Sequence, residues 1–248
     1  MAERLKDKIA IVTGGASGFG EGIARRFARE GARVAIADLN EAAAHKLAKE
    51  LDGLAIRTDI SRGTDVKALV QAVRAKWGES DILVNNAGIG HKPQPLDALS
   101  EEAFDRILAI NAKSVFLTAR EIVPAMKAKK RGAILNIAST GGVSPRPNLT
   151  WYNASKGWMI TATRAMAVEL APFGIRVNAI NPVAGETPLL ATFMGEDTPE
   201  IRAKFLASIP IGRFSTPDDI AAAACFLCSD EASMITGVAL EVDGGRCI

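Results

Sequence analysis

The chain has 248 residues, 48% of them hydrophobic, and a formal net charge of +2. This composition allows one large domain with a sizeable core, and the small charge gives no sign of a nucleic acid as partner. Since no apolar run could span a bilayer and the first six residues lack the apolar core of a signal peptide, we expect a cytoplasmic protein that does not enter a membrane.

The first predicted elements are a strand, a glycine-rich turn and a helix. An apolar run over 8–12 is typical of a buried strand, and apolar residues recur at helical spacing over 23–28. Between them lie Gly14, Gly18 and Gly20. A helix N-terminus offers free N–H groups and glycine permits close approach, so this segment predicts a phosphate-binding turn. An ordinary tight connection is the alternative, because the spacing is G-x-x-x-G-x-G rather than G-x-G-x-x-G.

An acidic residue follows the second predicted strand. The strand at 33–37 ends at Asp38, about 20 positions past the glycine turn, where a carboxylate can bind a ribose 2′-hydroxyl. The same carboxylate would repel a 2′-phosphate, which favours NAD over NADP. The alternative is an N-cap for the helix that starts near Glu41.

Strands and helices alternate along the rest of the chain. The further predicted strands are 54–57, 81–84, 133–137, 175–180 and 238–242. The further predicted helices are 41–51, 65–77, one capped by Ser100, 112–129 with an interruption or bend at Pro124, 151–170, a helical patch at 201–206, and one starting at Pro217. This alternation predicts an α/β fold, a parallel sheet with helices on both faces. The absence of a repeat or linker in the sequence predicts a single domain over 1–248.

Polar residues stand just past several predicted strands. They are Asp38, Asp59, Asn86, Ser139 and Asn181. Ligands of such sheets bind beyond the carboxyl ends of the strands, so one cleft is expected to gather them.

Tyr152 and Lys156 are four residues apart at the start of a long helix and therefore share one face. A tyrosine has a pKa near 10, and an adjacent ammonium that stabilises the phenolate would make it a proton acceptor or donor at neutral pH. Ser139 adds a hydroxyl that could hold a substrate oxygen. The alternative is an ordinary surface Tyr–Lys pair.

Cys225 and Cys228 form a C-x-x-C in an apolar helix. No cluster of further ligands accompanies them in the sequence, so they are expected to be small core residues and no metal site is predicted.

The chain resembles the short-chain dehydrogenase/reductase family over nearly its whole length. The matching segments are the turn at 13–20, Asn85-Asn86-Ala87-Gly88, the pair Asp59 and Ile60, and the tetrad Asn111, Ser139, Tyr152 and Lys156. The resemblance implies a Rossmann-type doubly wound parallel sheet of about seven strands and a homotetramer.

The same resemblance implies roles for single residues. Tyr152 would be the acid/base, Lys156 would lower its pKa and bind the nicotinamide ribose, Ser139 would orient the substrate, and Asn111 would hold a water. The residues expected to bind NAD(H) are Gly14, Ser17, Gly18, Phe19, Gly20, Asp38, Leu39, Asp59, Ile60, Asn86, Ala87, Gly88, Tyr152, Lys156, Pro182, Val183 and Thr187.

One segment departs from the family pattern, which has Pro-Gly after the sixth strand. Here Val183 follows Pro182, and Gly185 is expected to restore the flexibility that the missing glycine would give; Thr187 keeps a hydroxyl for the nicotinamide carboxamide. Ser17 also favours NAD, since NADP-using relatives often carry a basic residue there.

The mixture of polar and apolar residues expected around the pocket suits a small substrate such as a polyol, sugar, hydroxy acid or other secondary alcohol. The residues expected to contact it are His91, Ser139, Gly141, Arg146, Trp151, Glu186 and Leu190, under a lid at 188–212. Arg146 could bind a carboxylate or sulfonate, or could be solvated or paired with a neighbouring acid.

The predicted function is an NAD(H)-dependent oxidoreductase that interconverts secondary alcohols and ketones. A 3-oxoacyl-[acyl-carrier-protein] reductase using NADPH is the alternative, because the basic run at 127–131 could meet an acidic carrier protein. A dinucleotide-sensing protein without catalysis is more remote, because the tetrad is intact.

Overall fold

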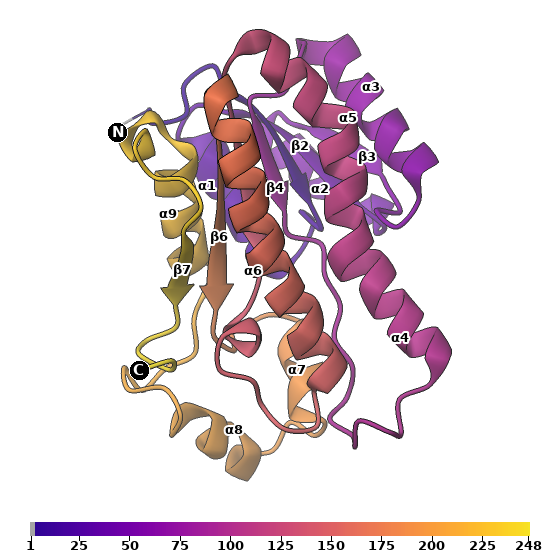
Figure 1. The fold of residues 1–248 in the computed structure, drawn as a ribbon, viewed down its shortest axis with the longest axis vertical. Helices are drawn as coiled ribbons and strands as arrows, with labels where there is room; N and C mark the ends of the chain where they lie inside the picture. The colour runs from indigo at the N-terminus through magenta and orange to yellow at the C-terminus, as the bar shows by residue number, and fades with distance from the viewer. Residues whose placement is uncertain (1–2) are drawn as a thin grey trace.

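Seven parallel strands form one sheet in the order β3-β2-β1-β4-β5-β6-β7 (Figure 1). The computed structural model describes residues 3–248. The strands are β1 Ile9–Thr13, β2 Arg33–Asp38, β3 Leu54–Arg57, β4 Ile82–Asn85, β5 Gly132–Ile137, β6 Ile175–Pro182 and β7 Ala239–Val242. The order reverses between β1 and β4, so the sheet is of the predicted doubly wound type and a crevice opens beyond these two strands.

Helices cover both faces of this sheet (Figure 1). They are α1 Gly18–Arg29, α2 Glu41–Leu51, α3 Gly63–Trp77, α4 Glu101–Leu108, α5 Ser114–Lys129, α6 Thr150–Leu170, α7 Leu189–Met194, α8 Pro199–Leu206 and α9 Pro217–Cys228. Within residues 3–248, no helix is both long and apolar enough to cross a membrane.

Alternating side chains of each strand serve the two faces. On β1, Ala10 and Val12 pack with α1, α2 and α9, where Phe27 is fully buried. Ile9 and Ile11 point the other way, into the layer formed by α3, α5 and α6. Cys225 and Cys228 belong to the first of these cores, as expected.

The predicted helix at 112–129 differs from the observed one in two ways. A π-helical turn, Ala109–Lys113, precedes α5, and α5 runs through Pro124 without interruption. Pro124 cannot bond the carbonyl of Arg120, but both residues are exposed, so water can satisfy that group.

A line of buried polar side chains crosses the middle of the sheet. Thr118 Oγ1 on α5 donates to Asn85 Oδ1 at 2.9 Å, and Asn85 Nδ2 donates to Asn136 Oδ1 at 2.8 Å. Asn136 Nδ2 donates in turn to Thr163 Oγ1 on α6 at 2.8 Å. These bonds satisfy groups that would otherwise be costly to bury, and they tie β4 and β5 to a helix at each end.

Candidate active site

A cavity of about 470 Å³ lies beyond the carboxyl ends of the strands. All the residues expected to bind NAD(H) line it except Gly20, and so do the catalytic candidates Ser139, Tyr152 and Lys156. Of the five polar residues expected in one cleft, four line the cavity, whereas Asn181 is buried and its amide faces Glu241. The structure therefore gathers most of the residues singled out in the sequence into one site.

The turn after β1 needs glycine for steric reasons. Gly14 and Gly18 have positive φ values of 59° and 54°. A Cβ on Gly20 would overlap the Gly14 carbonyl oxygen. Gly20 therefore allows the turn to pack tightly against the start of α1 and does not line the cavity. The Ser17 side chain caps no N–H group of α1 within residues 3–248, so the first turn of this helix is free to meet an anion.

Asp38 sits where the second strand ends and faces the same turn. Its Oδ2 accepts a hydrogen bond from the Ala16 N–H at 3.0 Å, and its Oδ1 accepts one from the Asn40 N–H at 2.9 Å. The N-cap of α2 is Asn40, which accepts from the Ala43 N–H, so the capping alternative for Asp38 is wrong.

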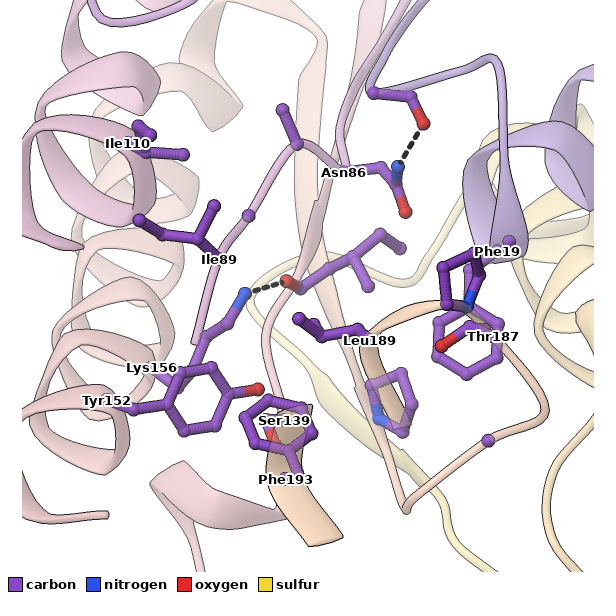
Figure 2. Close-up of a pocket in the computed structure, with 18 of the residues that line it drawn as sticks. Phe19, Asn86, Ile89, Ile110, Ser139, Tyr152, Lys156, Thr187, Leu189 and Phe193 are labelled. Carbon is purple, nitrogen blue, oxygen red and sulfur yellow. Dashed lines mark hydrogen bonds between the residues drawn. The ribbon is translucent and has the colours of Figure 1, made fainter. Parts of the chain in front are cut away.

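Two other segments close this end of the cavity. Asn86 Nδ2 donates to the carbonyl oxygens of Thr13 and Gly14, both at 2.9 Å, and so braces the glycine turn. Figure 2 draws one of these two bonds. Asp59 accepts bonds from the backbone and hydroxyl of Ser61, and these bonds help hold its pKa below the usual range.

The catalytic candidates come from β5 and α6. Figure 2 shows the Tyr152 hydroxyl directed into the cavity, toward Ser139. Lys156 Nζ donates to the Ile137 carbonyl at 2.8 Å and lies 6.0 Å from the centre of the Tyr152 ring. Both side chains are buried, which excludes the alternative of a surface Tyr–Lys pair.

Burial shifts the pKa values of both groups. Loss of solvent raises the pKa of Tyr152 to about 12, although a hydrogen bond with Ser139 opposes this shift. Loss of solvent also lowers the pKa of Lys156 to about 8. The expected lowering of the Tyr152 pKa by Lys156 is thus not found in the protein alone, because desolvation of the phenolate dominates the shift and the bond with Ser139 is what opposes it.

Asn111 lies behind this group, in the π-helical turn. Its Nδ2 donates to the Ile89 carbonyl at 2.9 Å and to Ser155 Oγ at 3.0 Å, and its Oδ1 accepts from the Ile89 N–H. These contacts hold the strand-end segment against α6. Asn111 is buried and does not line the cavity.

The segment that departs from the family pattern is closely packed. Val183 is buried and bonds β7 through its N–H, to the Val242 carbonyl. A Cβ on Gly185 would overlap the Phe19 ring, so this glycine is required by a close contact rather than for flexibility. Thr187 lines the cavity opposite Lys156 (Figure 2).

The expected substrate contacts divide into two groups. Ser139, Gly141, Arg146 and Leu190 line the cavity. The other three do not line it: the His91 ring is bonded to the Lys92 carbonyl, Trp151 Nε1 donates to the Leu96 carbonyl, and Glu186 is exposed.

Several lining residues carry no sequence signal of their own. They include Ile89, Arg106, Ile110, Leu149, Asn153 and Phe205. Only Asn153, next to Tyr152, could have been inferred from its place on the helix. The expected lid at 188–212 contains α7 and α8, and its Phe193 ring packs 4.8 Å from that of Tyr152.

Known proteins match the chain from end to end. A family model described as enoyl-(acyl carrier protein) reductase matches residues 14–246. The 4-formylbenzenesulfonate dehydrogenase TsaC1/TsaC2 of Comamonas testosteroni is 49% identical, over 98% of this chain and 99% of its own. The 2-(S)-hydroxypropyl-CoM dehydrogenase 3 of Xanthobacter autotrophicus is 39% identical over 99% and 98%.

A solved structure extends the likeness to the fold. It is described as a 3-ketoacyl-(acyl-carrier-protein) reductase from Brucella melitensis complexed with NADH, and is 54% identical. It covers 98% of this chain and 100% of its own, with a TM-score of 0.94. The chain therefore belongs to the short-chain dehydrogenase/reductase family and is an oxidoreductase of alcohols and ketones.

Proposed function

We propose that the protein uses NAD(H) to interconvert small secondary alcohols and ketones, with Tyr152 as the acid/base. The observation that carries the proposal is the single cavity in which Asp38 and the Tyr152–Ser139–Lys156 group lie together. The cavity thus has one part suited to a ribose and another suited to a reacting oxygen.

The glycine cradle supports binding of a dinucleotide. Side chains at Gly14 or Gly18 would meet Ala87 or Thr187 at 2.9 and 3.1 Å, so the backbone is bare where a pyrophosphate would approach. When bound, the nicotinamide would accept or supply the hydride.

Asp38 supports NAD over NADP. Its carboxylate lines the cavity beside the turn, where it can accept bonds from ribose hydroxyls and would repel a 2′-phosphate. Arg106 also lines the cavity, and its charge helps to lower the pKa of Asp59.

The residues of this chain would manage the proton and the substrate oxygen. The Tyr152 hydroxyl would donate its proton to a carbonyl oxygen or, as phenolate, accept one from an alcohol. Ser139 would bond the same oxygen. Lys156, with a pKa of about 8, is poised to exchange its own proton near neutral pH and is held in place by the Ile137 carbonyl. The closing of α7 and α8 over the site would exclude water.

A 3-oxoacyl-[acyl-carrier-protein] reductase is the second candidate, favoured by the description of the 54% identical structure. The basic run proposed to meet a carrier protein does not support it, because Lys129 and Arg131 pair with Asp81, and Lys127 pairs with Glu169. This run also directly precedes β5, so it lies at the amino ends of the strands, opposite the cavity. A relative named for a small aromatic sulfonate supports a small-molecule substrate instead. A sensing protein without catalysis is not supported by the intact catalytic group.

The test compares NAD with NADP on a panel of secondary alcohols. Wild-type protein should have a much higher kcat/KM with NAD, and Asp38→Ala should reduce that ratio by at least about tenfold, the equivalent of one charge-assisted hydrogen bond. Activity on acetoacetyl thioesters with NADPH but not NADH would favour the second candidate.

We also propose a cytoplasmic homotetramer with no nucleic-acid or membrane partner. Half-exposed Phe116 on α5 and Trp158 on α6 support an assembly, since such side chains are often covered in oligomers. The mass measured by light scattering during size-exclusion chromatography tests the oligomeric state.

A further inference from the structure

Arg146 places a guanidinium in the wall of the catalytic cavity. It lies in the loop 143–149 that leads into α6. The Arg146 carbonyl accepts a hydrogen bond from Asn153 Nδ2 at 2.8 Å, and Asn153 directly follows Tyr152. The loop is therefore fastened to the helical turn that carries the catalytic hydroxyl.

The lid fixes the plane of this guanidinium. Arg146 Nη2 donates to Ser208 Oγ at 3.0 Å, and the guanidinium carbon lies 4.2 Å from the centre of the Phe205 ring. Arginine has five N–H donors, and the Ser208 bond is the one side-chain bond that Arg146 makes to residues 3–248. Most of its fork is thus available to a ligand.

A second guanidinium lies close to the first. Arg246 Nη1 donates to Ser144 Oγ at 3.0 Å, two residues before Arg146, while its buried Nε has no partner in the described chain. Burial lowers the pKa of Arg146, and the charge of Arg246 lowers it further. Neither guanidinium pairs with a carboxylate of residues 3–248. Within these residues, this excludes the alternative that Arg146 forms an ion pair with a neighbouring acid. Two neighbouring, partly buried cations are unfavourable unless an anion joins them.

We propose that Arg146 binds an anionic group of the substrate, a carboxylate or a sulfonate, while Ser139 and Tyr152 hold the reacting oxygen. Both anions present paired oxygens that match the arginine fork. Leu190, Phe193 and Phe205 line the same cavity and offer apolar contact to the carbon skeleton between the two polar groups. This inference rests on the proposed function and adds the substrate class.

Turnover of matched alcohols tests the inference. The anionic substrates are 4-(1-hydroxyethyl)benzoate and 4-(1-hydroxyethyl)benzenesulfonate, and the neutral one is 1-(4-methylphenyl)ethanol. Arg146→Gln should lower kcat/KM about 10- to 150-fold for the anionic pair, the range of a charge-assisted bond, mainly through KM. The kcat/KM for the neutral alcohol should change little. The control is Arg33→Gln, at an exposed arginine where β2 starts, and it should leave kcat/KM unchanged for both kinds of alcohol.

Binding without turnover gives a second readout. p-Toluenesulfonate should raise the thermal midpoint of the wild type more than neutral p-toluenesulfonamide does, and Arg146→Gln should remove the difference. Arg146→Lys should retain part of it, because lysine keeps the charge but loses the planar fork. This conservative variant also serves if the glutamine variant fails to fold.

The outcomes separate the two proposals. Oxidation of the neutral alcohol with no preference for the anions, and equal midpoint shifts from sulfonate and sulfonamide, would overturn the anion site and leave the proposed function standing. An Arg146-dependent shift by the sulfonate with no oxidation of any alcohol would support the anion site and count against the proposed function.

Discussion

The two halves of the cavity are built differently. The cofactor half is built from the turns after β1 to β4 and the segment after β6, where backbone groups, glycines and short side chains such as Asp38 form most of the wall. The substrate half consists of the loop 143–149, α7 and α8, where larger side chains such as Arg146, Phe193 and Phe205 form it. The first half is fixed by strand ends, and the second by side chains from segments distant in sequence.

This difference explains how one fold can keep a cofactor while its substrates vary. Changing a side chain in the substrate half leaves the strand ends in place, whereas adding a side chain to the glycine turn disturbs the backbone itself. Tyr152 and Lys156 stand where the halves meet, so variants there should show whether the division is real.

The largest effect is expected at Tyr152. Tyr152→Phe keeps the ring between the two halves but removes the proton donor, so kcat should fall by about 10²- to 10⁴-fold. The dissociation constant of NADH, measured by fluorescence titration, should change little. Turnover close to that of the wild type would show that another group moves the proton.

Lys156 should make stability depend on pH. Its folded pKa of about 8 lies below that of an unfolded lysine, so between these values the unfolded chain binds more protons than the folded one, and stability rises with pH. Without added nucleotide, the free energy of unfolding of the wild type should rise by about 1.6 kcal/mol between pH 8 and 9.5 relative to that of Lys156→Met. Denaturant titrations at each pH measure this. Parallel pH profiles of the two proteins would argue against a buried, neutralised amine.

The cofactor half should be sensitive to one added methyl group. Gly18→Ala puts a side chain at a φ of 54° and 3.1 Å from Thr187 Cβ, so the dissociation constant of NADH should rise about tenfold, or 1.4 kcal/mol. Gly157→Ala is the matched control, because its Cβ would lie 3.8 Å from the nearest atom. Equal NADH binding by the wild type and both variants would mean that the turn can relax.

The substrate half should tolerate the loss of a whole aromatic ring with a smaller effect on activity. Phe193→Ala removes the ring packed against Tyr152, and kcat/KM for the alcohol should fall about 2- to 10-fold, the range of an aromatic pair. NADH binding should be unaffected. A comparable loss of NADH affinity would show that the lid belongs to both halves.

What the sequence could predict follows the same division. The sheet and the cofactor turn were predictable because their residues are adjacent in the chain: the buried strands are continuous apolar runs, and the turn is a cluster of glycines. The role of Arg146 stayed open because its contacts, Ser208 and Phe205, lie about 60 residues away. The direction of the Tyr152 pKa shift was missed for a related reason: helical spacing brings Lys156 near but does not reveal how deeply the phenol is buried.

The line of polar side chains across β4 and β5 has a consequence for how the chain folds. The apolar residues of these strands are nearly interchangeable, so hydrophobicity alone would penalise a slipped pairing weakly. Asn85 and Asn136 are register partners, and a shift by one position in either direction would separate the two amides and place Asn85 opposite Leu135 or Ile137 in a dry interior. The two asparagines thus act as a check on strand alignment, selecting the one pairing in which β4 and β5 end together at the catalytic edge.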